Sequence, residues 1–433
     1  MSWDFETDDA FQAELAWIDD FVREEIEPVD RIVRDPYDVG DPVRKALIRP
    51  LQDVVKQRGL WACHLSPRLG GRGYGQLKLA LMNEVLGRSI CGPVVFGCQA
   101  PDSGNAEILA HFGTEDLKRR YLDPLLAGDI VSCFSMTEPQ GGTDPTLFET
   151  SAVLDGDEWV VNGEKWFSSN ARYAAFLIVM VVTEPDAVPH HRLSALVVPS
   201  ATAGVEIVRN VGAPGEPLGE GTHAYIRYTD VRVPKDHLLG DRGQGFVVAQ
   251  TRLGGGRIHH AMRTLARIRW ALDTMCERAL SRTTTGGERL ASQQFVQQMI
   301  ADSWIEIEQF RLLVLQTAWK IDRYDDYKRV RGDISAVKAA MPKVYHDVAA
   351  RALQLHGSLG VSNELPFGDM VLDSFRMGLA DGATEVHKVT LARQVLSRHV
   401  PTDDLFPAYH LPRVEAQARR QLAPVLAALQ EDP

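Results

Sequence analysis

The sequence predicts an α+β protein in which a β domain lies between two helical domains. Three observations support this. Apolar residues recur at helical spacing over residues 8–129. Short apolar runs divided by turn residues follow over residues 130–245. Long helical periodicity then returns over residues 246–400. The sequence therefore divides into domains at 1–129, 130–245 and 246–400, with an extension at 401–433.

The first domain is expected to consist of helices joined by short connections that contain Pro and Gly. The middle domain is expected to be a small barrel or sandwich, in which Asp155-Gly156 and Asn162-Gly163 are typical turn pairs. Its strands are expected at Ser151–Leu154, Glu158–Val161, Phe176–Val182, Ser194–Val198, Val205–Val208 and Tyr225–Val233.

The third domain is expected to be a four-helix bundle that packs its apolar faces together. Its long helices are expected at Arg257–Arg282, Gln293–Tyr324, Ile334–Leu355 and Thr384–Val400. A short amphipathic helix at Arg413–Leu429 is expected to make a surface or subunit contact.

Composition excludes several classes of protein. The 433 residues carry a net charge of −11, which argues against broad nucleic-acid binding because phosphate repulsion is not offset. The five cysteines are scattered without C-x-x-C spacing, so they indicate neither a disulfide framework nor a metal site, and a reducing cytoplasm is expected. Residues 1–10 do not resemble a signal peptide. The longest apolar run, Ala174–Val182, is too short to be an integral membrane segment.

One nucleotide-binding motif fails its context test. Residues 219–224 match G-x-G-x-x-A, but that motif binds a pyrophosphate only where a strand enters it and a helix leaves it. Here a Pro/Gly loop precedes the match and a strand-like run follows it. We therefore interpret these residues as loop glycines.

Five sets of motifs follow one another along the chain. They are Cys133–Pro139 with Gly141–Asp144, Asn162–Asn170, Val231–Pro234 with Leu239-Gly240, Gln354–Gly360, and Asp381-Gly382 before the last helix. In sequence and in order, these motifs resemble those of the acyl-CoA dehydrogenase family. Two further segments, Cys98–Asn105 and Arg257–His260, resemble the branch that includes mammalian family members ten and eleven.

The resemblance implies an FAD cofactor held partly by the middle domain. Met136 and Thr137 would meet the pyrimidine edge of the flavin, Ser169 would approach N5, and Thr143 would reach the pyrophosphate. Taken alone, Thr137 and Ser169 could be ordinary strand-edge or turn hydroxyls. The cofactor contacts implied in this domain are Phe134, Met136, Thr137, Gly142, Thr143, Trp166, Phe167 and Ser169.

The resemblance also implies that a neighbouring subunit holds the phosphate and adenosine half of FAD, which predicts a homodimer or homotetramer. The residues implied are Arg282, Gln293, Gln354, Gly357 and Ser358, with Glu385 near the phosphate. On the residues alone, Arg282 could complement a helix dipole and Gly357 could end a helix.

Removing a proton beside a thioester carbonyl needs a well-placed carboxylate. Family members carry this acid either before the last helix or at the start of the middle helix, and those positions are Asp381 and Gly256 here. The resemblance therefore implies Asp381 as the base, because Gly256 has no carboxylate. Without the resemblance, Asp381 could instead cap the helix that starts near Thr384.

Three residues are implied to contact the substrate: Arg257, Ala380 and Gly382. Arg257 resembles a CoA-contacting arginine, although a surface ion pair is the alternative. The small Ala380 predicts room for branched acyl groups. The neighbouring His259 and His260 must face different directions on a helix, so we expect no metal ligands there.

The resulting hypothesis is α,β-desaturation of an acyl-CoA in fatty acid β-oxidation, with α-proton transfer to Asp381 and β-hydride transfer to FAD. Electrons would then pass to an electron-transfer flavoprotein. The alternatives are a flavin oxidase or monooxygenase of the same fold, such as a nitroalkane oxidase, and a non-catalytic acyl-CoA-binding protein.

Overall fold

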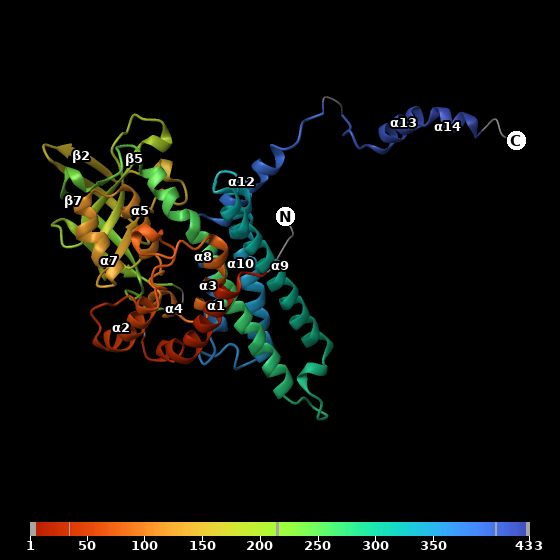
Figure 1. The fold of residues 1–433 in the computed structure, drawn as a ribbon, viewed down its shortest axis with the longest axis horizontal. Helices are drawn as coiled ribbons and strands as arrows, with labels where there is room; N and C mark the ends of the chain where they lie inside the picture. Colours follow the sequence, from red (N-terminus) through yellow and green to blue (C-terminus); the bar gives the residue numbers. More distant parts are fainter. Residues whose placement is uncertain (1–5, 34, 214–215, 403–404, 430–433) are drawn as a thin grey trace.

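The computed structural model describes residues 6–33, 35–213, 216–402 and 405–429. Helices of the N-terminal part lie below a β domain, and a bundle of long helices packs beside both (Figure 1). The predicted α+β fold class and its order of helices, sheet and helices are confirmed.

The N-terminal part is helical, as predicted. Its first helix begins with the Asp8 carboxylate accepting a hydrogen bond from the Phe11 amide (3.0 Å), which satisfies one free donor of the first turn. The core buries apolar residues such as Ile18, Ile48 and Leu86. The helices are α1 Asp9–Phe21, α2 Pro42–Gln57, α3 Gln76–Leu86, α4 Gly92–Val95, α5 Asp102–Phe112, α6 Glu115–Leu117 and α7 Asp123–Ala127, with short 3-10 and π-helical turns between some of them.

The middle domain is built on one mixed sheet. Its hydrogen-bonded order is β6-β7-β3-β2-β4-β5-β8, and β1 pairs in parallel with β4. The six expected strands are all present, and β1 and β8 were not predicted. The strands are β1 Val131–Ser135, β2 Ser151–Asp155, β3 Glu158–Lys165, β4 Ala174–Val182, β5 Leu193–Pro199, β6 Val205–Val211, β7 His223–Pro234 and β8 Leu238–Leu239.

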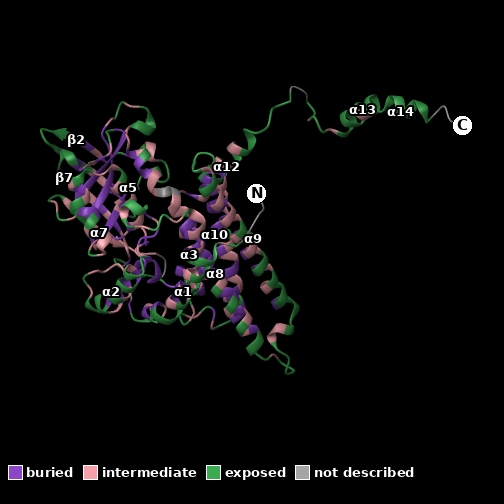
Figure 2. Ribbon diagram, in the orientation of Figure 1, coloured by how far each residue is buried: buried purple, intermediate pink, exposed green. Residues whose placement is uncertain are grey.

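Strand β4 is buried on both faces. Figure 2 shows buried strands inside the middle domain. Alternate side chains of a strand point to opposite faces, so Phe176 and Ile178 enter one core with residues of α5, α7 and the later helix α8 (Gly245–Ser281). Leu177 and Val179 enter a second core with residues of β3 and β7. This explains the continuous apolar run that stands out in the sequence.

Long helices form the C-terminal bundle, whose core includes Leu265, Phe310, Val337 and Met370. Helix α3 of the N-terminal part packs against both α8 and α9. The helices are α8 Gly245–Ser281, α9 Gln294–Tyr324, α10 Arg331–His356, α11 Phe367–Leu379 and α12 Thr384–Leu396.

Helix α8 begins close to residue 246, where helical periodicity was expected to return. The long periodic stretch expected at Arg257–Arg282 forms its later part, and the helix also runs through Gly255 and Gly256. A Cβ at Gly255 would lie 2.9 Å from the side-chain amide nitrogen of Gln76, at the start of α3.

The Asn162-Gly163 pair is not a turn, which corrects the prediction. It lies inside β3, where the register with β7 shifts between Val161 and Gly163. Gly163 adopts φ +143°, and a Cβ there would lie 2.6 Å from the Cα of Thr150. The glycine therefore serves a β-bulge with a close backbone approach. The other pair, Asp155-Gly156, is the expected turn between β2 and β3.

The C-terminal extension projects away from the body of the protein (Figure 1). The single helix predicted at Arg413–Leu429 is divided into α13 Leu411–Gln421 and α14 Ala423–Ala428, because Pro424 opens the second helix. Among the described residues, no helix is both long and apolar enough to cross a membrane.

Candidate active site

The loops that follow β1 and β3 are held side by side. The Trp166 amide donates to the Thr137 carbonyl oxygen (2.8 Å). Beneath them the Lys165 Nζ contacts the Glu138 carboxylate and the Met136 carbonyl oxygen, each at 2.8 Å. The ion pair of Lys165 and Glu138 is fully buried, with 0% and 1% of the side chains exposed. It therefore fixes the two predicted flavin-binding loops relative to each other.

Burial and the charge of the partner both shift the pKa values of Lys165 and Glu138. Burial lowers the pKa of Lys165 to about 8, although Glu138 acts in the opposite direction. Burial raises the pKa of Glu138, but the Lys165 charge and the hydrogen bonds it accepts outweigh this and leave it below its usual value. The Glu138 carboxylate also accepts from the amides of Glu149 (2.7 Å) and Thr150 (3.0 Å).

Two aromatic rings and a hydroxyl are presented at the edge of these loops. Phe167 is 39% exposed and adopts φ +56°, a strained conformation for a bulky residue. Its ring stacks on His223, with centroids 4.5 Å apart, and lies 5.5 Å from that of Trp166. Ser169 Oγ lies 2.9 Å from His223 Nδ1. Backbone strain of this kind gathers at functional sites, so the loop is shaped to present Phe167 and Ser169.

His223 remains neutral at ordinary pH, because burial lowers its pKa to about 4. Its Nε2 atom is buried and has no partner among the described residues. Sequence reasoning did not select His223, although it lies within the rejected G-x-G-x-x-A match, where the structure has a loop and the start of β7.

Arg252 connects this region to α8. Its guanidinium lies 4.2 Å from the centroid of the Phe134 ring and its Nε donates to the Asn105 side chain (3.0 Å). Its charge also acts on Asp381. The middle domain, α5 and the bundle therefore meet at one arginine.

Asp381 lies between α11 and α12 in a left-handed conformation (φ +56°). Its carbonyl oxygen accepts from Arg257 Nε (3.3 Å) and from His387 Nε2 (3.2 Å). The N-cap of α12 is Ala383, and no side chain caps that helix. The alternative in which Asp381 is a helix cap is therefore wrong, and its carboxylate is available for another role.

The Asp381 carboxylate faces His260. Its Oδ2 lies 2.9 Å from His260 Nδ1, and the two side chains are 18% and 23% exposed. Burial raises the pKa of Asp381, but the opposing effects of His260, Lys338 and Arg252 are larger in sum, so its pKa lies well below the usual range. Asp381 is therefore a largely buried carboxylate with cationic side chains near it.

The two other predicted substrate residues border Asp381. Ala380 ends α11 and is half-buried. Gly382 has φ +104°, and a Cβ there would lie 2.9 Å from His387 Nε2. A side chain at position 382 would therefore disturb the hydrogen bond that holds the Asp381 carbonyl.

The remaining predicted cofactor residues lie elsewhere. Gly142, Thr143 and Glu385 are exposed on the turn after β1 and on the first turn of α12. Five of these residues form a distal set, exposed near the connection of α8 to α9 and the end of α10: Arg282, Gln293, Gln354, Gly357 and Ser358. Lys338, whose charge acts on Asp381, and Gln354 of the distal set are 16 residues apart on α10, about 24 Å along the helix axis. One chain therefore does not bring its distal set next to Asp381.

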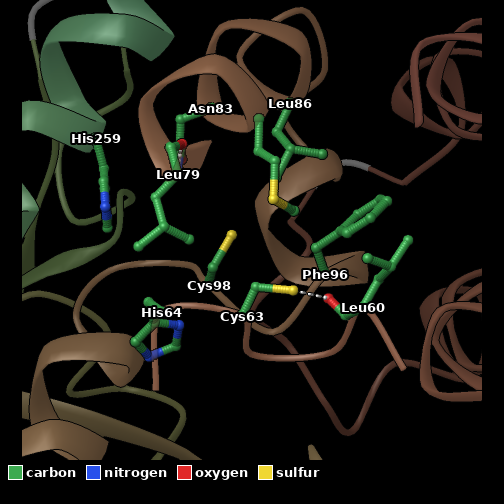
Figure 3. Close-up of a pocket in the computed structure, with 10 residues that line it drawn as sticks. Leu60, Cys63, His64, Leu79, Asn83, Leu86, Phe96, Cys98 and His259 are labelled. Atoms are coloured by element: carbon green, nitrogen blue, oxygen red, sulfur yellow. Dashed lines mark hydrogen bonds between the residues drawn. The ribbon is translucent and has the colours of Figure 1, made fainter. Parts of the chain in front are cut away.

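A small cavity lies between α3 and the His259 side of α8, with a volume of about 10 Å³, room for one water molecule. It is lined by His64, Cys63, Cys98 and His259, among others (Figure 3). Burial lowers the pKa of His64 to about 4 and that of His259 well below its usual value, so both are neutral. Within the described ranges, no group of three or more His, Cys, Asp or Glu side chains is placed to hold a metal ion.

His259 and His260 face different directions, as predicted. The contact of His260 with Asp381 was nevertheless missed, because the pair was considered only as metal ligands. Lys338 and Arg252 were missed as well. For Arg252 the signal was helical spacing, since Arg252, Gly256 and His260 recur every four residues on one face of α8, whereas nothing near Lys338 on α10 indicates its role.

Comparisons with known proteins agree with this architecture. Three family models match: acyl-CoA dehydrogenase N-terminal domain at residues 8–129, middle domain at 133–225, and C-terminal domain at 243–396. Probable acyl-CoA dehydrogenase FadE2 of Mycobacterium tuberculosis is 41% identical over 92% of this chain and 94% of its own length. Acyl-CoA dehydrogenase family member 11 of Rattus norvegicus is 37% identical over 89% of this chain, which spans half the length of that relative.

Solved structures show the same fold. A structure assigned as an acyl-CoA dehydrogenase from Mycobacterium abscessus matches with a TM-score of 0.84 and 35% identity, covering 92% of this chain and all of that one. Butyryl-CoA dehydrogenase from Megasphaera elsdenii matches with a TM-score of 0.76 and 26% identity, covering 91% and 100%. The chain thus belongs to the acyl-CoA dehydrogenase family of flavin-dependent oxidoreductases, close to the branch of family members 10 and 11.

Proposed function

We propose that the protein is an FAD-dependent acyl-CoA dehydrogenase that introduces an α,β double bond into an acyl thioester, with Asp381 as the base. The observation that carries this proposal is the state of Asp381. Its backbone is held by Arg257 and His387, its carboxylate caps no helix, and it remains partly accessible between α8 and α10. A positioned carboxylate that is not used to cap a helix is what abstraction of an α-proton requires.

The residues fit FAD. Phe134, Met136, Thr137, Trp166, Phe167 and Ser169 would hold the flavin ring, Gly142 and Thr143 the pyrophosphate, and Glu385 would lie nearby. When bound, FAD supplies the acceptor for the β-hydride. The exposed Phe167 ring and the buried, unpartnered His223 Nε2 support a ligand at this edge.

We propose that the distal set completes the FAD site of a second subunit in a homodimer or homotetramer. Arg282, Gln293 and Gln354 are exposed at one end of the bundle, so a neighbouring molecule can reach them. Gly357 supports this reading, since nothing lies within 4 Å of its Cβ position. Ser358 beside it is exposed as well.

The substrate would enter beside Asp381. Arg257 would approach the CoA moiety while its Nε holds the Asp381 carbonyl. Ala380 and Gly382 leave room at the reacting carbons, which favours branched acyl groups. Removal of the α-proton by Asp381 would coincide with departure of the β-hydride, and the excluded water would strengthen the electrostatic contacts.

Residues 1–129, 130–245 and 246–400 are proposed as the three domains, and residues 401–433 as an extension. An electron-transfer flavoprotein is the proposed electron acceptor and the cytoplasm the proposed location. The five free cysteines are consistent with a reducing compartment.

The test is anaerobic titration of the purified holoenzyme with a panel of straight and branched acyl-CoAs while flavin absorbance is recorded. Bleaching by acyl-CoAs supports the proposal, and preference for branched chains supports the role of Ala380. A colourless protein that binds acyl-CoA would indicate a non-catalytic binding protein. A reduced enzyme that consumes oxygen rapidly would indicate an oxidase or monooxygenase.

A further inference from the structure

The close contact between Asp381 and His260 joins the proposed base to a side chain with its own proton equilibrium. Imidazole is the group that changes charge between pH 5 and 8. The Oδ2–Nδ1 distance is 2.9 Å, but the contact lies off the hydrogen-bond axis. Such contacts are often poorly aligned before substrate binds, and a small rotation of either ring or carboxylate would align this one.

Every charged or titratable neighbour of Asp381 favours its ionised form or is neutral. Arg252 and Arg257 come from α8 and Lys338 from α10. From α12, His387 contacts the Asp381 carbonyl, and burial lowers its pKa to about 4, so it carries no charge at neutral pH. A carboxylate among so many cations binds a proton weakly, which is unfavourable for a base.

His260 is the neighbour that can make Asp381 a better proton acceptor. When its imidazole is neutral, one positive charge next to the carboxylate is removed and Asp381 becomes more basic. In the tautomer with hydrogen on Nε2, the Nδ1 lone pair can share the proton that Asp381 has taken up. When the imidazole is protonated, it holds Asp381 as a weakly basic ion pair.

Space beside this pair is consistent with substrate access. Arg252, Gly256 and His260 lie on one face of α8, and nothing lies within 4 Å of the Cβ position of Gly256. Because Gly256 has no side chain, a gap remains between the Arg252 guanidinium and the His260 imidazole. An acyl chain in this gap would lie against Asp381 and His260 together.

We propose that His260 is a positioning residue that forms a dyad with Asp381: its Nδ1 accepts a hydrogen bond from the Asp381 carboxyl group, and so orients that group, once the carboxylate has taken up the proton removed from the substrate. The proton leaves the α-carbon and binds Asp381, and Nδ1 of His260 then shares it. The C–H electron pair forms the new double bond as the β-hydride departs. This inference rests on the proposed function, because it needs Asp381 as the base.

The test compares holoenzyme variants that separate charge from hydrogen bonding. His260→Asn keeps a polar group near Nδ1 but cannot titrate, and His260→Ala removes both properties. His259→Gln is the matched control, since the adjacent histidine faces the small cavity. Asp381→Asn tests the base itself. Flavin content and thermal melting are recorded for each variant, so that loss of folding is recognised.

The first measurement is the pH dependence of kcat/KM. In the wild type, kcat/KM should rise with pH along an acid limb that belongs to the Asp381–His260 pair. In His260→Asn, that limb should move to lower pH by at least about one unit, because Asn does not titrate and only the carboxylate of the pair remains to do so. The maximal rate should fall at least about tenfold, with a change in KM below about threefold, a smaller loss than removal of the base.

The second measurement does not require turnover. Exchange of α-hydrogens into deuterated water is followed by mass spectrometry with a 3-thiaacyl-CoA, whose β-position is sulfur and cannot yield a hydride. Exchange should slow about tenfold in His260→Asn and more in His260→Ala, and it should be unchanged in His259→Gln.

The outcomes distinguish the two proposals. If Asp381→Asn abolishes exchange while the pH profile of His260→Asn superimposes on that of the wild type, the dyad is wrong and the base stands. If Asp381→Asn exchanges at the wild-type rate, the proposed function itself is wrong.

Discussion

The side chain of Lys165 and that of Glu138 form an ion pair with 0% and 1% of their surfaces exposed, beneath the loops that carry the proposed flavin contacts. Neither charge can be solvated if its partner is lost. Because Lys165 also donates to the Met136 carbonyl, the pair couples the stability of the middle domain to the position of a cofactor loop.

Replacing Lys165 with Met should therefore destabilise the protein strongly. Loss of one partner from a buried pair costs about 3–5 kcal/mol, since the other charge remains buried and unpaired. The double variant Lys165→Met with Glu138→Gln should recover much of this loss. Denaturant unfolding followed by circular dichroism measures both values. A loss below about 1 kcal/mol for the single variant would contradict the prediction.

Replacing Asp381 with Asn should leave the fold and the bound flavin intact, because Arg257 and His387 hold the backbone oxygen rather than the carboxylate. Proton abstraction should slow by about 10²- to 10⁴-fold. Stopped-flow flavin reduction by an acyl-CoA measures this. Asp369→Asn, an exposed acid on α11, should react like the wild type. Comparable rates in both variants would refute Asp381 as the base.

Replacing Arg282 with Ala should weaken FAD binding, although Arg282 is remote from Asp381. Loss of a hydrogen bond to a charged group costs roughly 1.5–3 kcal/mol, or about 10–150-fold in Kd. Fluorescence titration of the apoprotein with FAD measures the change. Arg323→Ala, another exposed arginine near the end of a bundle helix, is the control. Equal affinities in the two variants would argue against an intersubunit FAD site.

His387 should make stability depend on pH. Its Nε2 donates to the Asp381 carbonyl and its Nδ1 lies 3.3 Å from the Ser335 hydroxyl. Burial lowers its pKa from 6.5 to about 4, and the unfolded chain therefore binds one more proton between these values. Stability contributed by this group is present above pH 6.5 and is lost as the pH falls toward 4.

The variant His387→Gln should lack this dependence. The difference in unfolding free energy between wild type and variant should shrink by up to about 3 kcal/mol as the pH falls from 6.5 to 4. Urea titrations at several pH values provide the measurement. A difference that stays constant over that range would mean that His387 titrates alike in both states.

The local pattern in the sequence predicted most of the fold, because strands and long helices bury apolar side chains at regular spacing. Six strands were found within a few residues of their observed ends, including the strongly apolar β4. Helix α11 was missed because Pro366 and Gly368 at its start are typical of a loop. The bulge at Gly163 was missed because a close approach to the backbone of Thr150, which the local sequence does not contain, decides it.

The candidate site was predicted unevenly for a similar reason. Motif residues such as Thr137 and Ser169 were found because they stand in short, ordered segments of the chain. His260 and Lys338 act on Asp381 from helices that are distant in sequence, and nothing in their neighbours indicates this. His223 was missed because its segment was tested only as a nucleotide motif.

Strand β4 positions the loop that follows β1, in addition to filling the interior of its domain. Its parallel pairing with β1 sets Phe134 opposite Ile178 and Ser135 opposite Val179, immediately before the loop of Met136 and Thr137. If one residue of β4 were deleted, each side chain after the deletion would point into the opposite core. The pairing with β1, and with it the loop of Met136 and Thr137, would shift by one residue. Homologous enzymes should therefore vary in the apolar residues of this strand while keeping its length unchanged.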